Sequence, residues 1–66
     1  MRVIVNGEDR AFHGVKTVAA LVAALQLDGR KLAIELNLEI VPRSAYDRTA
    51  LRDGDRIEIV HFIGGG

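Results

Sequence analysis

The first twelve residues have the alternation of a β-hairpin. A strand is predicted at Arg2–Val5, where β-branched residues point to both faces, and a return strand follows at about Glu8 to Phe12. Asn6-Gly7 between them is a strong turn signal, because a type I′ turn needs positive φ angles at both of its central residues. We therefore expect two antiparallel strands joined by a tight turn.

Residues 17–27 have the period of an amphipathic helix. Thr17 is a good N-cap, and Asp28-Gly29 is predicted to end the helix. Apolar residues recur at i, i+3, i+4 and i+7, which places Val18, Leu21, Val22 and Leu25 on one stripe. We expect this stripe to pack on the inward apolar residues of the strands, namely Val3, Val5, Ile34, Leu36, Ile57 and Ile59.

The second half of the chain predicts three further strands. One begins near Lys31, turns at about Asn37-Leu38 and returns as a short strand that Pro42 stops. Residues 44–51 have weak periodicity and are predicted to form a single loose helical turn and a loop. A tight turn at 52–56 leads into the final strand, which places Ile57, Ile59 and His61 on one face and Glu58, Val60 and Phe62 on the other.

The order ββαβ(β)β predicts an α+β fold of the β-grasp, or ubiquitin-like, kind. It would contain a mixed sheet of four to five strands with one helix packed across one face. The last strand is expected in the centre, parallel to the first, because the helix provides the crossover that parallel neighbours require. We expect residues 1–63 to form this domain and residues 64–66 to form a flexible glycine tail.

Composition removes several classes of function. The 66 residues contain no Cys, and nine basic and nine acidic residues are dispersed to a formal net charge of zero. There is no basic stripe for nucleic acid, no apolar run long enough for a signal peptide or a membrane span, and no recognisable metal site. No glycine-rich loop precedes a helix, so a nucleotide site on this chain is not expected. A cytoplasmic location is permitted by the absence of Cys and is our expectation.

Two features call for more than a structural explanation. Val60 and Phe62 project from the sheet face opposite the helix, and with Ile4 and Ile63 they would form an apolar patch for a partner protein. The alternative is that a loop covers these side chains.

The second feature is the ending Gly64-Gly65-Gly66 directly after the best strand. Glycines at an end are often only a frayed tail. They also suit a tail that threads a narrow enzyme channel, because glycine has no Cβ to clash. The remaining reactive group is the α-carboxylate of Gly66, which we expect to be the functional group.

At this point the sequence resembles the ThiS sulfur carriers of thiamin biosynthesis, which are related to the MoaD carriers. The matching stretches are VIVNG, NLEIVPR (residues 37–43), DGDRIEIV (residues 53–60) and HFIGGG, and the match covers essentially the whole chain. Family members usually end in two glycines, and Gly64 is a third here.

The resemblance implies a protein cosubstrate with no catalytic side chain of its own. A ThiF-type adenylyltransferase would use ATP and Mg²⁺ to adenylate Gly66, and a persulfide from a donor protein would convert the adenylate to a thiocarboxylate. Thiazole synthase (ThiG) would then take the sulfur. The chain itself would bind no cofactor.

Three alternatives stay open from the sequence. A MoaD-type carrier of molybdopterin synthase would use the same terminal chemistry with another acceptor, although NLEIVPR favours ThiS. A ubiquitin-like tag would join Gly66 to lysines. A regulatory domain cut from a larger enzyme is the third, and Met1 together with a terminal glycine argues against it.

Overall fold

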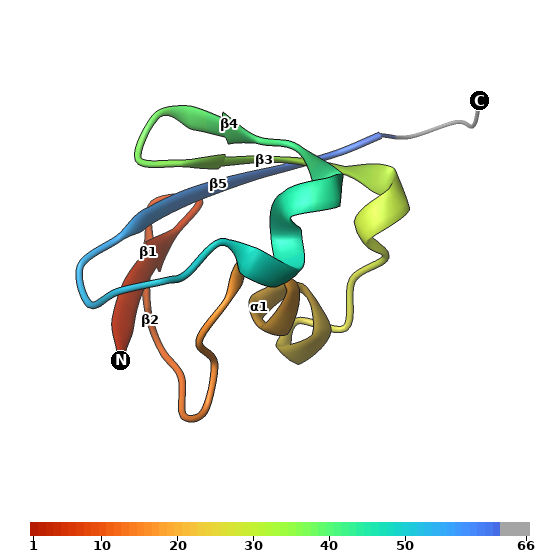
Figure 1. The fold of residues 1–66 in the computed structure, drawn as a ribbon. Coiled ribbons are helices and arrows are strands. Elements are labelled where there is room, and N and C mark those ends of the chain that lie inside the picture. The colour runs from red at the N-terminus through yellow and green to blue at the C-terminus, as the bar shows by residue number, and fades with distance from the viewer. Residues whose placement is uncertain (63–66) are drawn as a thin grey trace.

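Five strands form one mixed sheet in the structure, a computed structural model that describes residues 1–62. The strands are β1 (Arg2–Val5), β2 (Glu8–Ala11), β3 (Leu32–Leu36), β4 (Glu39–Val41) and β5 (Arg56–His61). Their order across the sheet is β2-β1-β5-β3-β4. β1 and β5 are parallel and the other pairings are antiparallel, which confirms the predicted central last strand (Figure 1).

Both hairpins turn through two residues with left-handed backbone. Asn6 and Gly7 have φ angles of 50° and 81°, and Asn37 and Leu38 have φ angles of 50° and 71°. These signs are those of type I′ turns, whose twist matches the twist of the flanking strands. Both turns lie where the sequence predicts them. Leu38 is unusual, because a side chain as large as leucine rarely adopts a positive φ.

Helix α1 (Val18–Ala24) begins at the predicted N-cap. The Thr17 hydroxyl accepts a hydrogen bond from the Ala20 amide at 3.1 Å, which satisfies one of the free N–H groups of the first turn. Val18, Leu21 and Val22 are buried, whereas Leu25 is only partly buried against the core. The predicted apolar stripe is therefore confirmed for its first three members.

The helix ends four residues earlier than Asp28-Gly29. Gln26 takes a φ of 58°, and the amides of Gln26 and Leu27 donate to the carbonyls of Ala23 and Val22. This is a Schellman termination with glutamine where glycine is usual. Asp28 instead caps a short 3₁₀ helix, η1 (Gly29–Lys31), by accepting a hydrogen bond from the Arg30 amide.

The core lies between the sheet and α1, and a second 3₁₀ helix, η2 (Arg43–Arg48), closes it. Figure 1 shows η2, in teal, on the same side of the sheet as α1. Tyr46 of η2 and Leu51 after it are buried, although the weak periodicity there predicts only a loose turn and a loop. Leu36, expected in the core, is partly buried. The buried apolar residues are Val3, Val5, Val18, Leu21, Val22, Leu32, Ile34, Val41, Tyr46, Leu51, Ile57 and Ile59.

We predict that Leu21→Ala lowers the free energy of unfolding by about 2–5 kcal/mol, because Leu21 is 0% exposed and the truncation leaves a cavity. A core of this size supplies only about 3–5 kcal/mol in total, so the variant should lose most of its net stability. Urea denaturation followed by circular dichroism measures the change.

Leu38→Ala is the matched control, since it removes the same atoms from a side chain that is 87% exposed. The placement of α1 is wrong if the two variants unfold at the same urea concentration.

Candidate functional site

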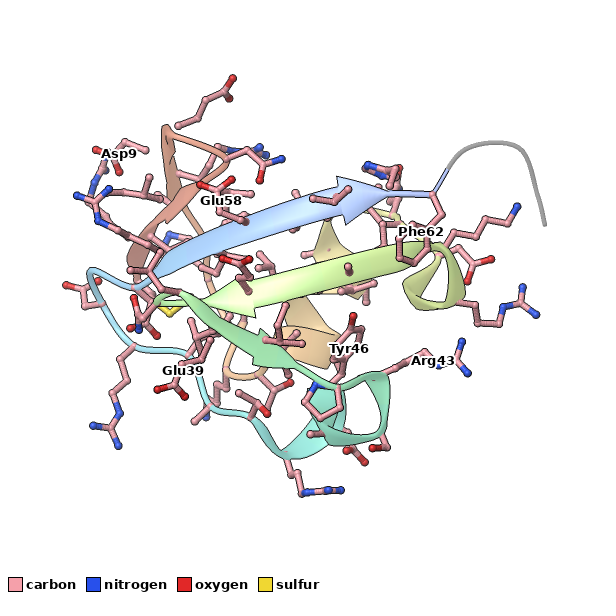
Figure 2. All side chains as sticks on the ribbon, turned by 90° about the horizontal axis from the view of Figure 1, so that it is seen from above. Asp9, Glu39, Arg43, Tyr46, Glu58 and Phe62 are labelled. Carbon is pink, nitrogen blue, oxygen red and sulfur yellow. The ribbon has the colours of Figure 1, made fainter. Side chains whose placement is uncertain are left out.

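The open face of the sheet carries exposed apolar side chains near the end of β5. Ile57 and Ile59 point toward the core and are buried, so Glu58 and Val60, which alternate with them, face outward. Val60 is 58% exposed and Phe62 is 61% exposed. In Figure 2 the open face is toward the viewer, and Phe62 lies at the end of β5. The predicted exposure of these two side chains is confirmed.

Strand register decides which residues lie beside them. Val60 is opposite Ala33 of β3, and the Phe62 amide donates to the Lys31 carbonyl at 2.8 Å. Ile4, in contrast, is opposite Arg56. Arg56 lies four residues before Val60, a separation of about 13 Å along a strand.

The structure therefore does not bring Ile4 together with Val60 and Phe62, because β1 pairs only with the first half of β5. The other members of the predicted site, Ile63, Gly64, Gly65 and Gly66, lie outside the described residues. The roles of all these residues in partner binding and in chemistry stay predictions.

The second half of β5 is held on the β1 side by one side chain. Asn6 Nδ2 donates to the Ile59 carbonyl at 3.1 Å, and the Ile59 amide donates to Asn6 Oδ1 at 2.7 Å. The last register pair between β1 and β5 is Val5 with Ile57. The side-chain amide of Asn6 therefore extends the contact with β5 beyond the point where β1 ends. The sequence predicts Asn6-Gly7 as a turn and gives no sign of this second role.

The η1 turn holds β5 on its other side. Asp28 accepts hydrogen bonds from the Arg30 amide and from Arg30 Nε and Nη2, at 2.9–3.1 Å. The hydrogen bonds from the Arg30 side chain are the main reason that the pKa of Asp28 falls to about 2. Asp28 therefore stays ionised at neutral pH. Lys31, the last residue of η1, accepts the hydrogen bond from the Phe62 amide through its carbonyl. The η1 turn therefore helps to fix the last described residue of the chain.

Asp53-Gly54-Asp55 lies in the tight turn that the sequence predicts before β5. Asp53 accepts a hydrogen bond from the Arg2 amide, and Asp55 accepts hydrogen bonds from the Arg52 amide and the Asn37 side chain. Within residues 1–62 no group of three or more His, Asp or Glu side chains could hold a metal ion. In the same part of the chain, no helix is both long and apolar enough to cross a membrane.

A family model described as the ThiS family matches residues 3–66. The chain belongs to this family. Sulfur carrier protein ThiS of Bacillus subtilis is 40% identical over 62 residues, which are 92% of this chain and 94% of that protein. The crystal structure of the thiamine biosynthesis protein ThiS from Geobacter metallireducens superposes with a TM-score of 0.85 at 36% identity, over 100% of both chains. The β-grasp fold predicted from the element order is thereby confirmed.

ThiS-like sequence also occurs inside longer proteins. A thiazole synthase of Paramagnetospirillum magneticum is 54% identical over 66 residues, and one of Magnetococcus marinus is 38% identical over the same length. The chain spans about a fifth of each of these two proteins, 20% in both cases. Membership of the ThiS family favours a ThiS-type carrier over the MoaD-type carrier that the sequence left open.

We predict that Asn6→Gly destabilises the end of β5 while the turn survives. Glycine accepts the left-handed φ of this position but loses both side-chain hydrogen bonds to Ile59. The loss should lower the free energy of unfolding by about 1–3 kcal/mol. Hydrogen exchange followed by NMR should show faster exchange of the Ile59 amide, with a smaller effect on the Val3 amide. Unchanged protection at Ile59 would show that β3 alone holds this part of β5.

Proposed function

We propose that this ThiS-family chain carries sulfur for thiamin thiazole biosynthesis on the α-carboxylate of Gly66. The observation that carries the proposal is that the family match runs to residue 66, through the terminal glycines. The name of the Bacillus subtilis relative, a sulfur carrier, supports it. So does the fold, in which the central strand β5 ends at His61, five residues before Gly66 in the sequence.

The proposed chemistry begins with activation of the carboxylate. An oxygen of Gly66 attacks the α-phosphorus of ATP, held with Mg²⁺ by a ThiF-type adenylyltransferase, and pyrophosphate leaves. The resulting acyl-adenylate has a good leaving group, which a free carboxylate lacks. The terminal sulfur of a donor protein's persulfide then attacks the acyl carbon and displaces AMP. A thiol cleaves the acyl disulfide, forming a new disulfide and leaving the thiocarboxylate on Gly66.

We further propose thiazole synthase as the protein that receives the sulfur. Two thiazole synthases contain a segment that is similar to this whole chain, which supports a functional link between this chain and thiazole synthase. In this scheme the chain is a cosubstrate rather than an enzyme, and it works in the cytoplasm, where ATP is supplied. Its own contribution is a docking face and a correctly placed carboxylate.

We predict that deleting Gly66, or adding one Ala after it, lowers the rate of ATP–pyrophosphate exchange catalysed by the adenylyltransferase at least about 100-fold. One residue moves the carboxylate by up to about 3.3–3.6 Å, and a misplacement of even about 1 Å can cost roughly 100-fold in rate. Urea midpoints measured alongside confirm that both variants are folded. If all three proteins exchange equally well, the carboxylate of Gly66 is not the reacting group.

We predict that Phe62→Asp weakens the complex with the adenylyltransferase at least about tenfold, because docking would desolvate the new charge. Phe62 is 61% exposed, so the fold should tolerate the change. Ala11→Asp, at an exposed position on the edge strand β2, is the control. Isothermal titration calorimetry should separate the two variants. Equal affinities would remove Phe62 from the docking face.

A further inference from the structure

Asn6 holds β5 with its side-chain amide and is also followed by a glycine. Asn6 Nδ2 donates to the Ile59 carbonyl at 3.1 Å, and the Ile59 amide donates to Asn6 Oδ1 at 2.7 Å. Only this orientation of the side-chain amide gives each contact both a donor and an acceptor. A chemical change at Nδ2 would therefore act directly on β5, the central strand of the sheet (Figure 1).

The Asn6-Gly7 sequence is chemically labile in an open chain. Asparagine is among the thermolabile residues, and glycine has no Cβ to hinder its own backbone nitrogen. The Gly7 nitrogen can form a bond to Asn6 Cγ and give up its proton, while the Cγ–Nδ2 bond breaks and Nδ2 leaves as ammonia with that proton. Water then opens the cyclic imide. The product is aspartate if the new bond to Cγ breaks, and isoaspartate if the bond to the backbone carbonyl carbon breaks.

The fold opposes the first of these steps. Cγ carries both Oδ1 and Nδ2, so its approach to the Gly7 nitrogen moves both atoms away from Ile59 and costs two hydrogen bonds. The turn also holds Asn6 and Gly7 at φ angles of 50° and 81°. Asn6 is exposed, so the fold does not protect it by excluding water. The protection comes from the attachment of its side chain to β5.

The other hairpin contains a matched asparagine. Asn37 also begins a two-residue turn with a φ angle of 50°. Its Oδ1 accepts from the Arg56 amide at 2.9 Å, and its Nδ2 donates to Asp55 at 3.0 Å. The next residue is Leu38, whose side chain hinders attack by its backbone nitrogen. Asn37 is therefore an internal control that differs from Asn6 at the attacking residue.

We propose that Asn6 is a modification site, which deamidates when β5 separates from β1, and that the modified chain does not restore the end of β5. Aspartate at this position keeps an acceptor for the Ile59 amide, but it places a second acceptor where Nδ2 donated to the Ile59 carbonyl. Isoaspartate carries the main chain through the former side chain and lengthens the tight turn by one backbone atom. The modification thus marks chains that have been unfolded.

The test ages wild-type protein at neutral pH, folded in buffer and unfolded in guanidinium chloride. Trypsin then releases residues 3–10 with Asn6 and residues 32–43 with Asn37, and mass spectrometry measures the replacement of NH₂ by OH in each peptide. Asn6 should react at least about fivefold faster in the unfolded sample, because two hydrogen bonds no longer have to break. A synthetic peptide of residues 3–10, aged with and without guanidinium chloride, corrects for the direct effect of the denaturant.

Faster reaction at Asn6 on unfolding, with Asn37 left intact in both samples, supports the proposal. Equal corrected rates at Asn6 in the folded and unfolded protein would overturn the protection by Ile59. No reaction at Asn6 in the unfolded chain, or an equal reaction at Asn37, would overturn the assignment of the site.

Asn6→Asp reproduces the aspartate product and tests its effect on β5. It should lower the Tm by at least about 4 °C, because two acceptors then face each other at Ile59. Ala11→Asp adds the same charge at an exposed position on the edge strand β2 and is the control. An equal Tm for Asn6→Asp and the wild type would overturn the claim that the modified chain does not restore the end of β5.

Discussion

The parallel pairing of β1 with β5 is the contact on which the rest of the molecule depends. It is short, with only Ile4–Arg56 and Val5–Ile57 as register pairs. Backbone hydrogen bonds at 2.9 Å, from Ile4 to the Asp55 carbonyl and from Asn6 to the Ile57 carbonyl, hold it together. Because β5 also pairs with β3 along its whole length, this one strand joins the two hairpins into a single sheet. Without it neither hairpin would have a stable partner.

The parts of this arrangement that follow from local chemistry were predictable from the sequence. The positive φ angles of the two turns are foreshadowed by Asn6-Gly7 and Asn37, and the N-cap by Thr17. Alternation along β5 separates buried Ile57 and Ile59 from exposed Val60 correctly. The central place of β5 follows from the need for a crossover between parallel strands. The resemblance to the ThiS sulfur carriers also came from the sequence, through motifs spread over the whole chain.

The parts that depend on tertiary contacts were not predictable. Gln26 ends α1 in a conformation that glycine usually takes, so the glycine signal three residues later was misleading. Tyr46 is a buried residue of the 3₁₀ helix η2, whose three residues per turn differ from the 3.6 residues per turn of an α-helix. The distance between Ile4 and Val60 depends on how β1 and β5, which are far apart in the sequence, are placed against each other. For the same reason the bonds from Asn6 to Ile59 appear only when β1 and β5 are placed side by side.

The pairing of β1 with β5 also has a consequence for folding kinetics. Ile4 and Arg56 are 52 positions apart (56 − 4), so their contact closes a long loop. The chain loses conformational entropy when this loop closes, before the contacts between the strands can compensate for it. The β3–β4 hairpin and α1 involve short loops, and their contacts can form earlier. Because β5 lies between β1 and β3, the sheet is complete only when β5 is paired on both sides. The open face exists as a continuous surface only when β5 is paired on both sides, so any partner that binds across it would distinguish folded chains from unfolded ones.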